Sequence, residues 1–162
     1  MDMLLKILSE DWRCSNRQLS VLLGISEDEV EKKIKQYEDA GIIRGYKTVI
    51  NWEKVDDHDT VTALIEIRVS PNMESGFDGI AREIVRFDEV ESVYLMSGGF
   101  DLSVVVNGHT FKDIATFVSQ KLAPLPSVLS TATHFVLTRY KDDSIIMSEE
   151  PAEERRYDLY ND

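Results

Sequence analysis

The sequence predicts an α+β fold in two parts, a small helical domain followed by a domain with the order β-α-β-β-α-β. Two spacings typical of helix capping boxes, Ser15–Gln18 and Ser26–Glu29, each begin a short amphipathic segment. Apolar residues alternate with polar ones through Val61–Ser70, which indicates a strand with one buried face. Two further alternating runs flank Gly98–Gly99, and this pair of glycines predicts the turn of a hairpin.

The charge balance argues against a protein that is basic over its whole surface and coats nucleic acid. The 162 residues carry 18 Lys and Arg against 30 Asp and Glu, which gives a formal net charge of −12. Residues 1–45 hold 7 basic and 9 acidic side chains, so most of the excess acid lies later in the chain. A locally basic surface on the first domain is compatible with these numbers.

Cysteine usage and hydropathy exclude several further classes of protein. Cys14 is the only cysteine, which excludes an internal disulfide framework and a cysteine-based zinc site. No apolar run reaches the ~18 residues of a membrane span. The first residues, MDMLLKILSEDW, do not have the pattern of a secretory signal. We therefore expect a cytoplasmic protein.

Three short helices are expected in the first domain, residues 1–50. The second helix is predicted at Asn16–Leu23 and the third at Glu27–Ala40, and each is followed by a glycine, a common helix-ending residue. Residues 42–50, IIRGYKTVI, are predicted to form a short β wing. Apolar residues recur at helical spacing. Those that fit one face of the first helix are Leu4, Leu5, Ile7, Leu8 and Trp12, and those expected to be buried are Leu19, Leu22 and Leu23 in the second helix and Val30, Ile34 and Tyr37 in the third.

Two capped helices joined by a tight turn and followed by a wing predict a winged helix-turn-helix, which places its third helix in the major groove of double-stranded DNA. Lysine and arginine suit phosphates there, and glutamine suits an adenine edge. The first turn of the third helix is acidic, so a helix bundle with a merely solvated charged face is the alternative. The side chains expected to face DNA are Asn16 and Arg17 in the second helix, Asp28, Lys32, Lys35 and Gln36 in the third, and Arg44 and Lys47 on the wing.

Residues 51–60, NWEKVDDHDT, are polar and acidic and are expected to link the two domains. Asn51 can cap a short turn that buries Trp52 and Val55. His58 lies among three aspartates, but no second histidine or cysteine is close by to complete a metal site. A solvated loop is therefore the preferred interpretation of His58.

The second domain, residues 61–141, is predicted to have the ferredoxin-like βαββαβ arrangement. Its two helices cover one face of a four-stranded sheet, so a second copy of the chain is expected to cover the other face in a C2 dimer. Strands are expected at Val61–Ser70, Val90–Ser97, Asp101–Val106 and Val128–Lys141, and helices at Gly76–Phe87 and Phe111–Leu122. The last helix is expected to bury Phe111, Ile114, Ala115, Val118 and Leu122. Both alternating sets of the strands are substantially apolar, so the uncovered face is expected to be apolar whichever set forms it. That set is either one with residues such as Leu64, Val93, Leu95, Val105, Phe135 and Leu137, or the set of their neighbours.

Several short motifs, taken together, resemble the Lrp/AsnC family of feast/famine regulators. They are Leu-Gly-Ile-Ser before the third helix, Ala-Gly-Ile-Ile-Arg-Gly-Tyr after it, Tyr-Leu-Met-Ser-Gly-Gly-Phe-Asp-Leu in the hairpin, and Leu-Pro-Ser-Val with Ser-Thr-Ala-Thr at the last strand. The resemblance covers about residues 3–141. It implies a sequence-specific DNA-binding transcriptional regulator whose assembly or DNA binding responds to an amino acid or a related small metabolite. It also implies that the second domain, called RAM, binds the effector and that dimers assemble to tetramers or octamers.

The resemblance further implies an effector site between dimers, near the hairpin and the last strand. Asp101 would meet the α-ammonium group of an amino acid, and the main-chain N–H groups of Gly98–Gly99 would meet its carboxylate. Gly99 stands where many relatives carry an acid. In the alternative interpretation, the turn has no ligand and Asp101 caps backbone groups. The matching positions are Tyr94, Met96, Gly98, Gly99, Phe100 and Asp101 in the hairpin, and Thr131, Thr133, His134 and Phe135 in the last strand.

An enzyme and a regulator that acts without DNA are the two other classes of function. An enzyme is not expected, because the sequence has no nucleophile–base pair, metal-ligand spacing or phosphate-binding loop. Neither a metal nor another cofactor is expected. A ligand-sensing regulator that acts through a protein partner, without DNA, would account for the acidic third helix. Residues 142–162 are predicted to form an exposed acidic tail.

Overall fold

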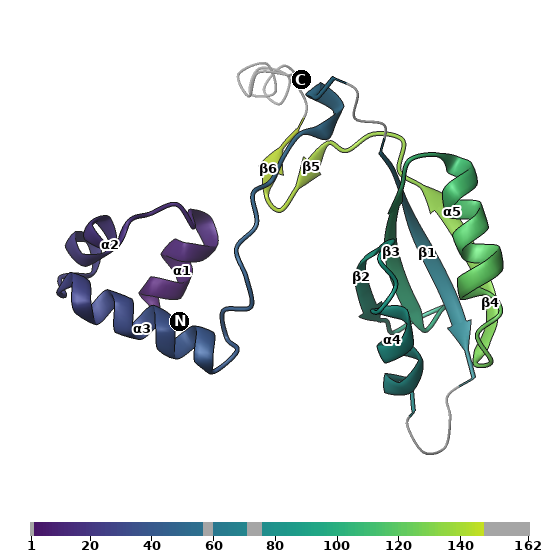
Figure 1. The fold of residues 1–162 in the computed structure, drawn as a ribbon, viewed down its shortest axis with the longest axis horizontal. Helices are drawn as coiled ribbons and strands as arrows, with labels where there is room; N and C mark the ends of the chain where they lie inside the picture. The colour runs from purple at the N-terminus through teal and green to yellow at the C-terminus, as the bar shows by residue number, and fades with distance from the viewer. Residues whose placement is uncertain (1, 57–59, 71–75, 148–162) are drawn as a thin grey trace, which may run out of the picture. The chain divides into compact units, whose positions relative to one another are not determined.

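The computed structural model describes residues 2–56, 60–70 and 76–147. The described residues fall into two compact units, divided between Thr48 and Val49. The first unit is helical, and the second contains an antiparallel sheet (Figure 1). Within the described ranges, no helix is long and apolar enough to cross a bilayer. His58 and the predicted tail beyond Met147 lie outside them.

The first unit contains the three predicted helices, α1 (Met3–Glu10), α2 (Asn16–Leu23) and α3 (Glu27–Asp39). Its fully buried residues are Leu4, Leu19 and Val30, one from each helix. The prediction that Leu22 is buried is wrong, since its side chain is 62% exposed. The buried stripe of α2 runs instead through Leu19 and Leu23, four residues apart, and Leu22 falls beside it.

The predicted β wing is absent, because residues 42–50 form no strand in the structure. Gly41 adopts a left-handed φ of +67°, and the N–H groups of Ile42 and Ile43 both donate to the Tyr37 carbonyl, at 2.8 and 3.1 Å. This closing pattern ends α3. Beyond it the chain is extended, and the described part of the first unit offers it no strand with which to pair.

The linker prediction is also wrong in detail. A short 3₁₀ helix, η1 (Trp52–Lys54), does form, but the Asn51 side chain does not cap it. Asn51 Nδ2 instead donates to the Met147 carbonyl at 3.1 Å. Trp52 and Val55 are 42% and 43% exposed rather than buried.

The second unit has the predicted βαββαβ order, with the strands arranged β2-β3-β1-β4 and all neighbours antiparallel. Its sheet is formed by β1 (Val61–Val69), β2 (Val90–Leu95), β3 (Leu102–Gly108) and β4 (Val128–Phe135). Its helices are α4 (Asp78–Ile84) and α5 (Phe111–Phe117), and a π-helical turn, η2 (Val118–Leu122), extends α5.

The last strand is shorter than predicted, because β4 ends at Phe135. A separate two-stranded hairpin follows, with β5 (Lys141–Asp142) paired to β6 (Ile145–Ile146). Its two-residue turn, Asp143–Ser144, has positive φ at both positions, 42° and 69°. These values are typical of a type I′ hairpin turn. The predicted acidic tail therefore begins with ordered structure.

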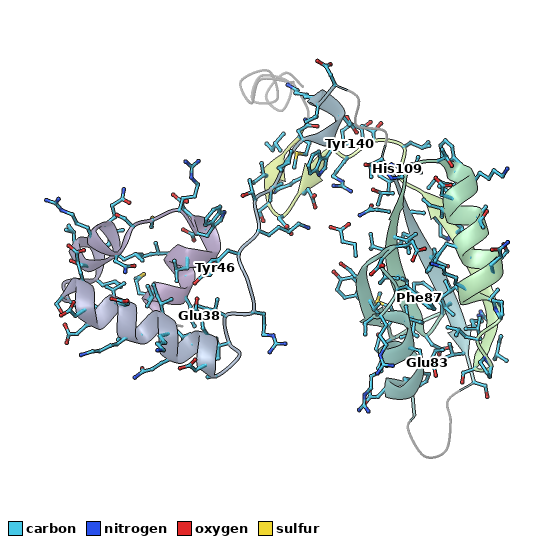
Figure 2. All side chains as sticks on the ribbon, in the orientation of Figure 1. Glu38, Tyr46, Glu83, Phe87, His109 and Tyr140 are labelled. Carbon is cyan, nitrogen blue, oxygen red and sulfur yellow. The ribbon has the colours of Figure 1, made fainter. Side chains whose placement is uncertain are left out.

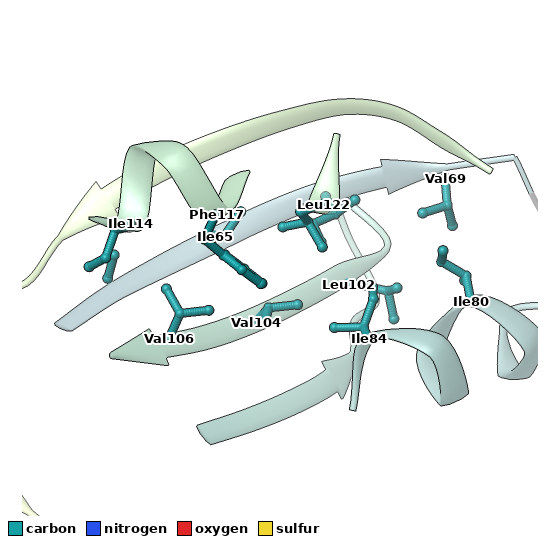
Figure 3. Close-up of a cluster of buried hydrophobic side chains, with 12 residues drawn as sticks. Ile65, Val69, Ile80, Ile84, Leu102, Val104, Val106, Ile114, Phe117 and Leu122 are labelled. Carbon is teal, nitrogen blue, oxygen red and sulfur yellow. The ribbon is translucent and has the colours of Figure 1, made fainter. Parts of the chain in front are cut away.

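The core of the second unit lies between the sheet and its two helices (Figure 3). Ile65 and Val104 of the sheet are fully buried there, and α5 contributes Ile114 and Phe117. Phe111 was expected in this core, but it is 57% exposed, and Ala115 is exposed as well. The buried stripe of α5 runs from Ile114 to Phe117, so the first residue of the helix lies beyond the covered area.

The expectation of an apolar uncovered face is wrong. Residues directly opposite each other in antiparallel strands share a face. Val93, Leu95 and Phe135 pair with the core residues Val104, Leu102 and Ala63, so they lie on the helix-covered face. The uncovered face has the half-buried Leu64 and Val105 among polar side chains that include Thr62, Glu66, Ser103, Asn107 and His134.

Candidate functional site

Local capping fixes the α2–turn–α3 arrangement. The Ser26 hydroxyl accepts from the Glu29 N–H at 3.3 Å, and the Ser26 N–H donates to Glu29 Oε2 at 2.9 Å. Gly24, with a φ of +67°, ends α2 and donates its N–H to the Ser20 carbonyl at 2.9 Å. Val30 is fully buried, so it fixes the rotation of α3 about its axis. The opposite side of α3 therefore faces solvent.

That solvent side carries the side chains predicted to meet DNA. Arg17 is exposed at the start of α2 and Asn16 is half-buried. Lys33 is also exposed, but three residues after Val30 it lies beside the buried stripe and close to Asp2, so it is not on this side. The first turn of α3 is acidic, which suits the positive end of the helix dipole. Asp28, Lys32, Lys35 and Gln36 are all exposed on α3.

Arg44 and Lys47 are exposed in the segment that follows α3. A Cβ added to Gly41 would lie 3.2 Å from a guanidinium nitrogen of Arg44, so the Arg44 side chain lies back against the end of α3. The cation of Arg44 is therefore next to the helix that carries Lys35 and Gln36. Side-chain packing, rather than a β ladder, brings the predicted wing residue toward the helix.

Tyr46 holds this segment in place. Its hydroxyl donates to Glu38 Oε1 at 3.0 Å (Figure 2). Its ring centroid lies 6.3 Å from that of Trp12. Burial and the neighbouring Glu38 carboxylate raise the pKa of Tyr46. The segment is thus connected through Tyr46 to Glu38 of α3 and to Trp12 in the turn between α1 and α2.

Asp2 and Tyr37 form a contact that sequence reasoning missed. The Tyr37 hydroxyl donates to Asp2 Oδ2 at 2.8 Å, while Asp2 Oδ1 caps α1 by accepting from the Leu4 N–H at 2.8 Å. One carboxylate therefore caps α1 and joins it to α3. The hydrogen bond from Tyr37 lowers the pKa of Asp2, and the same bond raises the pKa of Tyr37. A helix-capping aspartate at position 2 was visible in the sequence, but its distant partner was not.

Acid should weaken the helical unit through Asp2 and Glu29. The pKa of each carboxyl is lowered, by the Tyr37 hydroxyl at Asp2 and by hydrogen bonds from Ser26 at Glu29, from ordinary values of 3.8 and 4.5. A lowered folded-state pKa contributes stability above the ordinary value, and this stability is lost as the pH falls through the folded-state pKa. The melting temperature should therefore fall below about pH 4.5. It should fall less in Asp2→Asn/Glu29→Gln, as circular dichroism melts from pH 7 to 3 would show. If the melting temperatures of wild type and the double variant fall equally with pH, Asp2 and Glu29 do not cause the loss of stability in acid.

The predicted effector hairpin is an open loop between β2 and β3. The Met96 N–H donates to the Asp101 carbonyl at 2.8 Å and closes the base of the loop. Gly98 has a φ of +144°, a conformation that side chains with a Cβ rarely adopt. Ser97, Gly98 and Gly99 are exposed, and Phe100 is half-buried. A Cβ on Gly98 or Gly99 would meet no atom within 4 Å, so the conformation, rather than close packing, explains Gly98.

The structure divides the predicted effector residues between the two faces of the sheet. Thr131, Thr133 and Phe135 pair with buried residues of β1, so they lie on the helix-covered face. Tyr94 and His134 pair with residues of the uncovered face. Met96 and the loop residues lie at one end of the sheet. The described part of one chain therefore does not bring the whole set together in one pocket.

The uncovered face brings together a histidine and a glutamate whose proximity was not predicted. His134 Nε2 lies 3.5 Å from Glu66 Oε2, and both side chains are partly exposed. Glu66 is also opposite Ser103, a buried polar residue at 4% exposure. The alternation in β1 already placed Glu66 on the opposite face from Ile65, which was the available signal.

Two family descriptions match this chain. Residues 3–44 match "Winged helix-turn-helix DNA-binding", and residues 62–146 match "Lrp/AsnC ligand binding domain". The chain belongs to the Lrp/AsnC family. Within this family it is 48% identical over 140 residues to the "Uncharacterized HTH-type transcriptional regulator YugG" of Bacillus subtilis, covering 86% of this chain and 84% of that one. It is 32% identical over 139 residues to the HTH-type transcriptional regulator LrpA of Pyrococcus abyssi, covering 85% and 94%.

Solved structures of Lrp/AsnC-type regulators share the fold. One is the L-Met complex of the transcriptional regulator NMB0573 from Neisseria meningitidis, with a TM-score of 0.69 and 25% identity over 88% of this chain and 93% of that one. Another is the leucine response regulatory protein LrpA of Mycobacterium tuberculosis, with a TM-score of 0.73 and 22% identity, covering 91% and 100%. Family membership confirms the predicted class, a DNA-binding transcriptional regulator, over a regulator that acts without DNA.

Proposed function

We propose that this regulator binds operator DNA through the exposed side of α3, and that an amino acid bound near the Ser97–Phe100 loop changes its assembly or its DNA binding. The orientation of α3 is the observation that carries this proposal. Val30 faces the core, and the lysines of the helix face solvent after a capped turn. A helix-turn-helix presents its third helix to the major groove in this way.

The charges of α3 indicate how the helix would lie on DNA. Its first turn is acidic, and carboxylates are repelled by phosphates, so the phosphate contacts fall to the later Lys32 and Lys35 and to Arg44. Gln36 is the neighbouring side chain suited to an adenine edge. Arg17 at the start of α2 would contact the DNA backbone. The DNA-contacting residues of α3 would therefore follow its acidic first turn, from Lys32 to Gln36.

Two observations support the effector proposal. They are the ligands of similar solved structures and the distribution of the predicted effector residues over different parts of the sheet. NMB0573 was solved as an L-Met complex, and so was a feast/famine regulatory protein of Mycobacterium tuberculosis. The loop, Tyr94 and Thr133 are on different parts of the sheet in one chain. A site completed by a second chain fits this distribution better than a pocket within one subunit. We propose an amino acid or a close analogue as the effector.

A second copy of the chain is the proposed cover for the β5–β6 region. Leu137 and Tyr140 are 87% and 70% exposed, and Ile145 and Ile146 are 52% and 55% exposed. Two-residue strands form a hairpin that is marginal in water without a packing partner. This apolar region, rather than the polar sheet face, is the surface through which we propose that dimers form.

Assembly is therefore predicted to depend on Leu137 and Ile146. The variant Leu137→Asp/Ile146→Asp places two charges in the proposed contact, where burial of an unpaired charge is strongly unfavourable. We expect wild type to sediment as a dimer or larger species at micromolar concentration, and the variant to sediment as a monomer with an unchanged far-ultraviolet spectrum. Leu129→Asp is the matched control, since Leu129 is also 68% exposed but lies in β4. A monomeric wild type would overturn the proposed assembly.

One experiment tests the function as a whole. Purified protein would select fragments from a genomic library, with and without each of the twenty amino acids. We expect a small set of enriched fragments that share a motif, with at least one amino acid changing the enrichment. Enrichment that no amino acid changes would support operator binding and contradict the amino-acid effector. If no fragment is enriched under any condition, the proposed operator binding is wrong.

A further inference from the structure

Asp101 is at the centre of three hydrogen bonds that join the effector loop to the sheet. Its N–H donates to the Ile67 carbonyl at 3.0 Å, and its carbonyl accepts from the Met96 N–H at 2.8 Å. Its carboxylate Oδ2 accepts from the Val69 N–H at 2.9 Å, and this bond is partly buried. The residue thus contacts β1 twice and closes the loop once.

The Val69 N–H needs this acceptor because it lies beyond the start of β3. The pairing of β1 with β3 ends at Ile67 and Leu102, and the Ile67 carbonyl accepts from the Asp101 N–H. Backbone groups two residues apart on a strand point to the same neighbour, so the Val69 N–H also points toward β3, where the ladder has already ended. An unpaired buried N–H is costly, and a carboxylate is a strong substitute acceptor. The side chain of Asp101 therefore completes the hydrogen bonding of β1 at its end.

We propose that Asp101 is a positioning residue for the effector, and that its carboxylate acts on the protein rather than on the ligand ammonium. This inference rests on the proposed effector function. Asp101 holds the Ser97–Phe100 loop against the end of β1, and Gly98 supplies the positive φ that the loop requires. The ligand then meets the main chain of a loop whose shape is already set.

The carboxylate of Asp101 has two properties, a negative charge and an acceptor oxygen, and the two possible roles of the residue depend on different ones. An ammonium ligand would require the negative charge, so asparagine and alanine at this position would both abolish the contact. A bond to the Val69 N–H requires an acceptor oxygen, which asparagine retains and alanine lacks. Asp101→Asn and Asp101→Ala therefore give different results under the two roles.

The test uses the full chain and calorimetric titration with the amino acid that wild type binds. We expect Asp101→Asn to bind within about 3-fold of wild type and Asp101→Ala to bind at least ~10-fold more weakly, as expected for loss of a hydrogen bond to a charged group. Asp88→Ala, which removes an exposed aspartate at the opposite end of β2 from the loop, is the control and should bind as wild type. If Asp101→Asn loses as much affinity as Asp101→Ala, the positioning role is wrong.

Amide hydrogen exchange provides a second readout that needs no ligand. Exchange at Val69 should be at least ~10-fold faster in Asp101→Ala than in wild type, with Asp101→Asn close to wild type. Unchanged exchange at Val69 in Asp101→Ala would overturn the inference. If wild type binds none of the amino acids, the proposed amino-acid effector is wrong. The exchange measurement at Val69 still decides whether Asp101 holds the loop against β1.

Discussion

The triple variant Lys32→Ala/Lys35→Ala/Arg44→Ala is expected to bind operator DNA roughly 100-fold more weakly than wild type near 0.15 M salt. Each phosphate contact releases counterions, and its loss lowers the slope of log K against log salt by about 0.9. Three losses should lower that slope by about 2.7. Fluorescence anisotropy at several salt concentrations, with a fragment from the genomic selection, measures both quantities.

Matched controls separate the reading surface from the overall charge of the protein. Lys112→Ala removes an exposed lysine of α5, in the other unit, and should leave both affinity and slope unchanged. Glu31→Gln removes an exposed acid from α3 and should strengthen binding at low salt, because it removes repulsion from phosphates. If the triple variant keeps the wild-type slope, Lys32, Lys35 and Arg44 do not contact the DNA backbone.

Local signals in the sequence predicted the helical unit well. The bounds of α2 follow directly from Ser15 and Gly24, because a capping box and a left-handed glycine act over one helical turn. The same holds at the start of α3, where Ser26 and Glu29 satisfy each other's backbone groups. The predicted wing failed because a strand depends on a partner elsewhere in the chain, and residues 42–50 carry no local sign of whether one exists.

The site was less predictable because alternation does not say which face of a strand is covered. Each strand of the sheet offers two sets of residues, and helix position decides between them. The sequence grouped Phe135 with Leu64 in one possible set, whereas the register puts Phe135 beside Ala63 on the covered face and Leu64 on the other. Contacts across long sequence separations were equally hidden. The bonds from Tyr37 to Asp2 and from Val69 to Asp101 join residues 35 and 32 positions apart.

Phe117→Ala and Phe111→Ala should differ strongly in their effect on stability, although both residues belong to α5 and each makes an edge-to-face contact. Phe117 is 3% exposed and its ring lies 5.5 Å from Phe87, whereas Phe111 is 57% exposed and its ring lies 4.8 Å from Phe135. Truncating a buried phenylalanine costs about 3–5 kcal/mol, since the lost burial and the cavity add. Loss of an exposed aromatic contact costs about 0.5–1.5 kcal/mol.

Urea unfolding followed by circular dichroism measures the difference between these two variants. With an m value of about 1–3 kcal/mol per molar urea, Phe117→Ala should lower the midpoint by at least ~1 M. Phe111→Ala should lower it by a fraction of that amount. Because the pair shares a residue type, a helix and an aromatic contact, burial is the variable that remains. Equal losses would show that Phe111 is covered in solution, which would place it in a contact between copies of the chain.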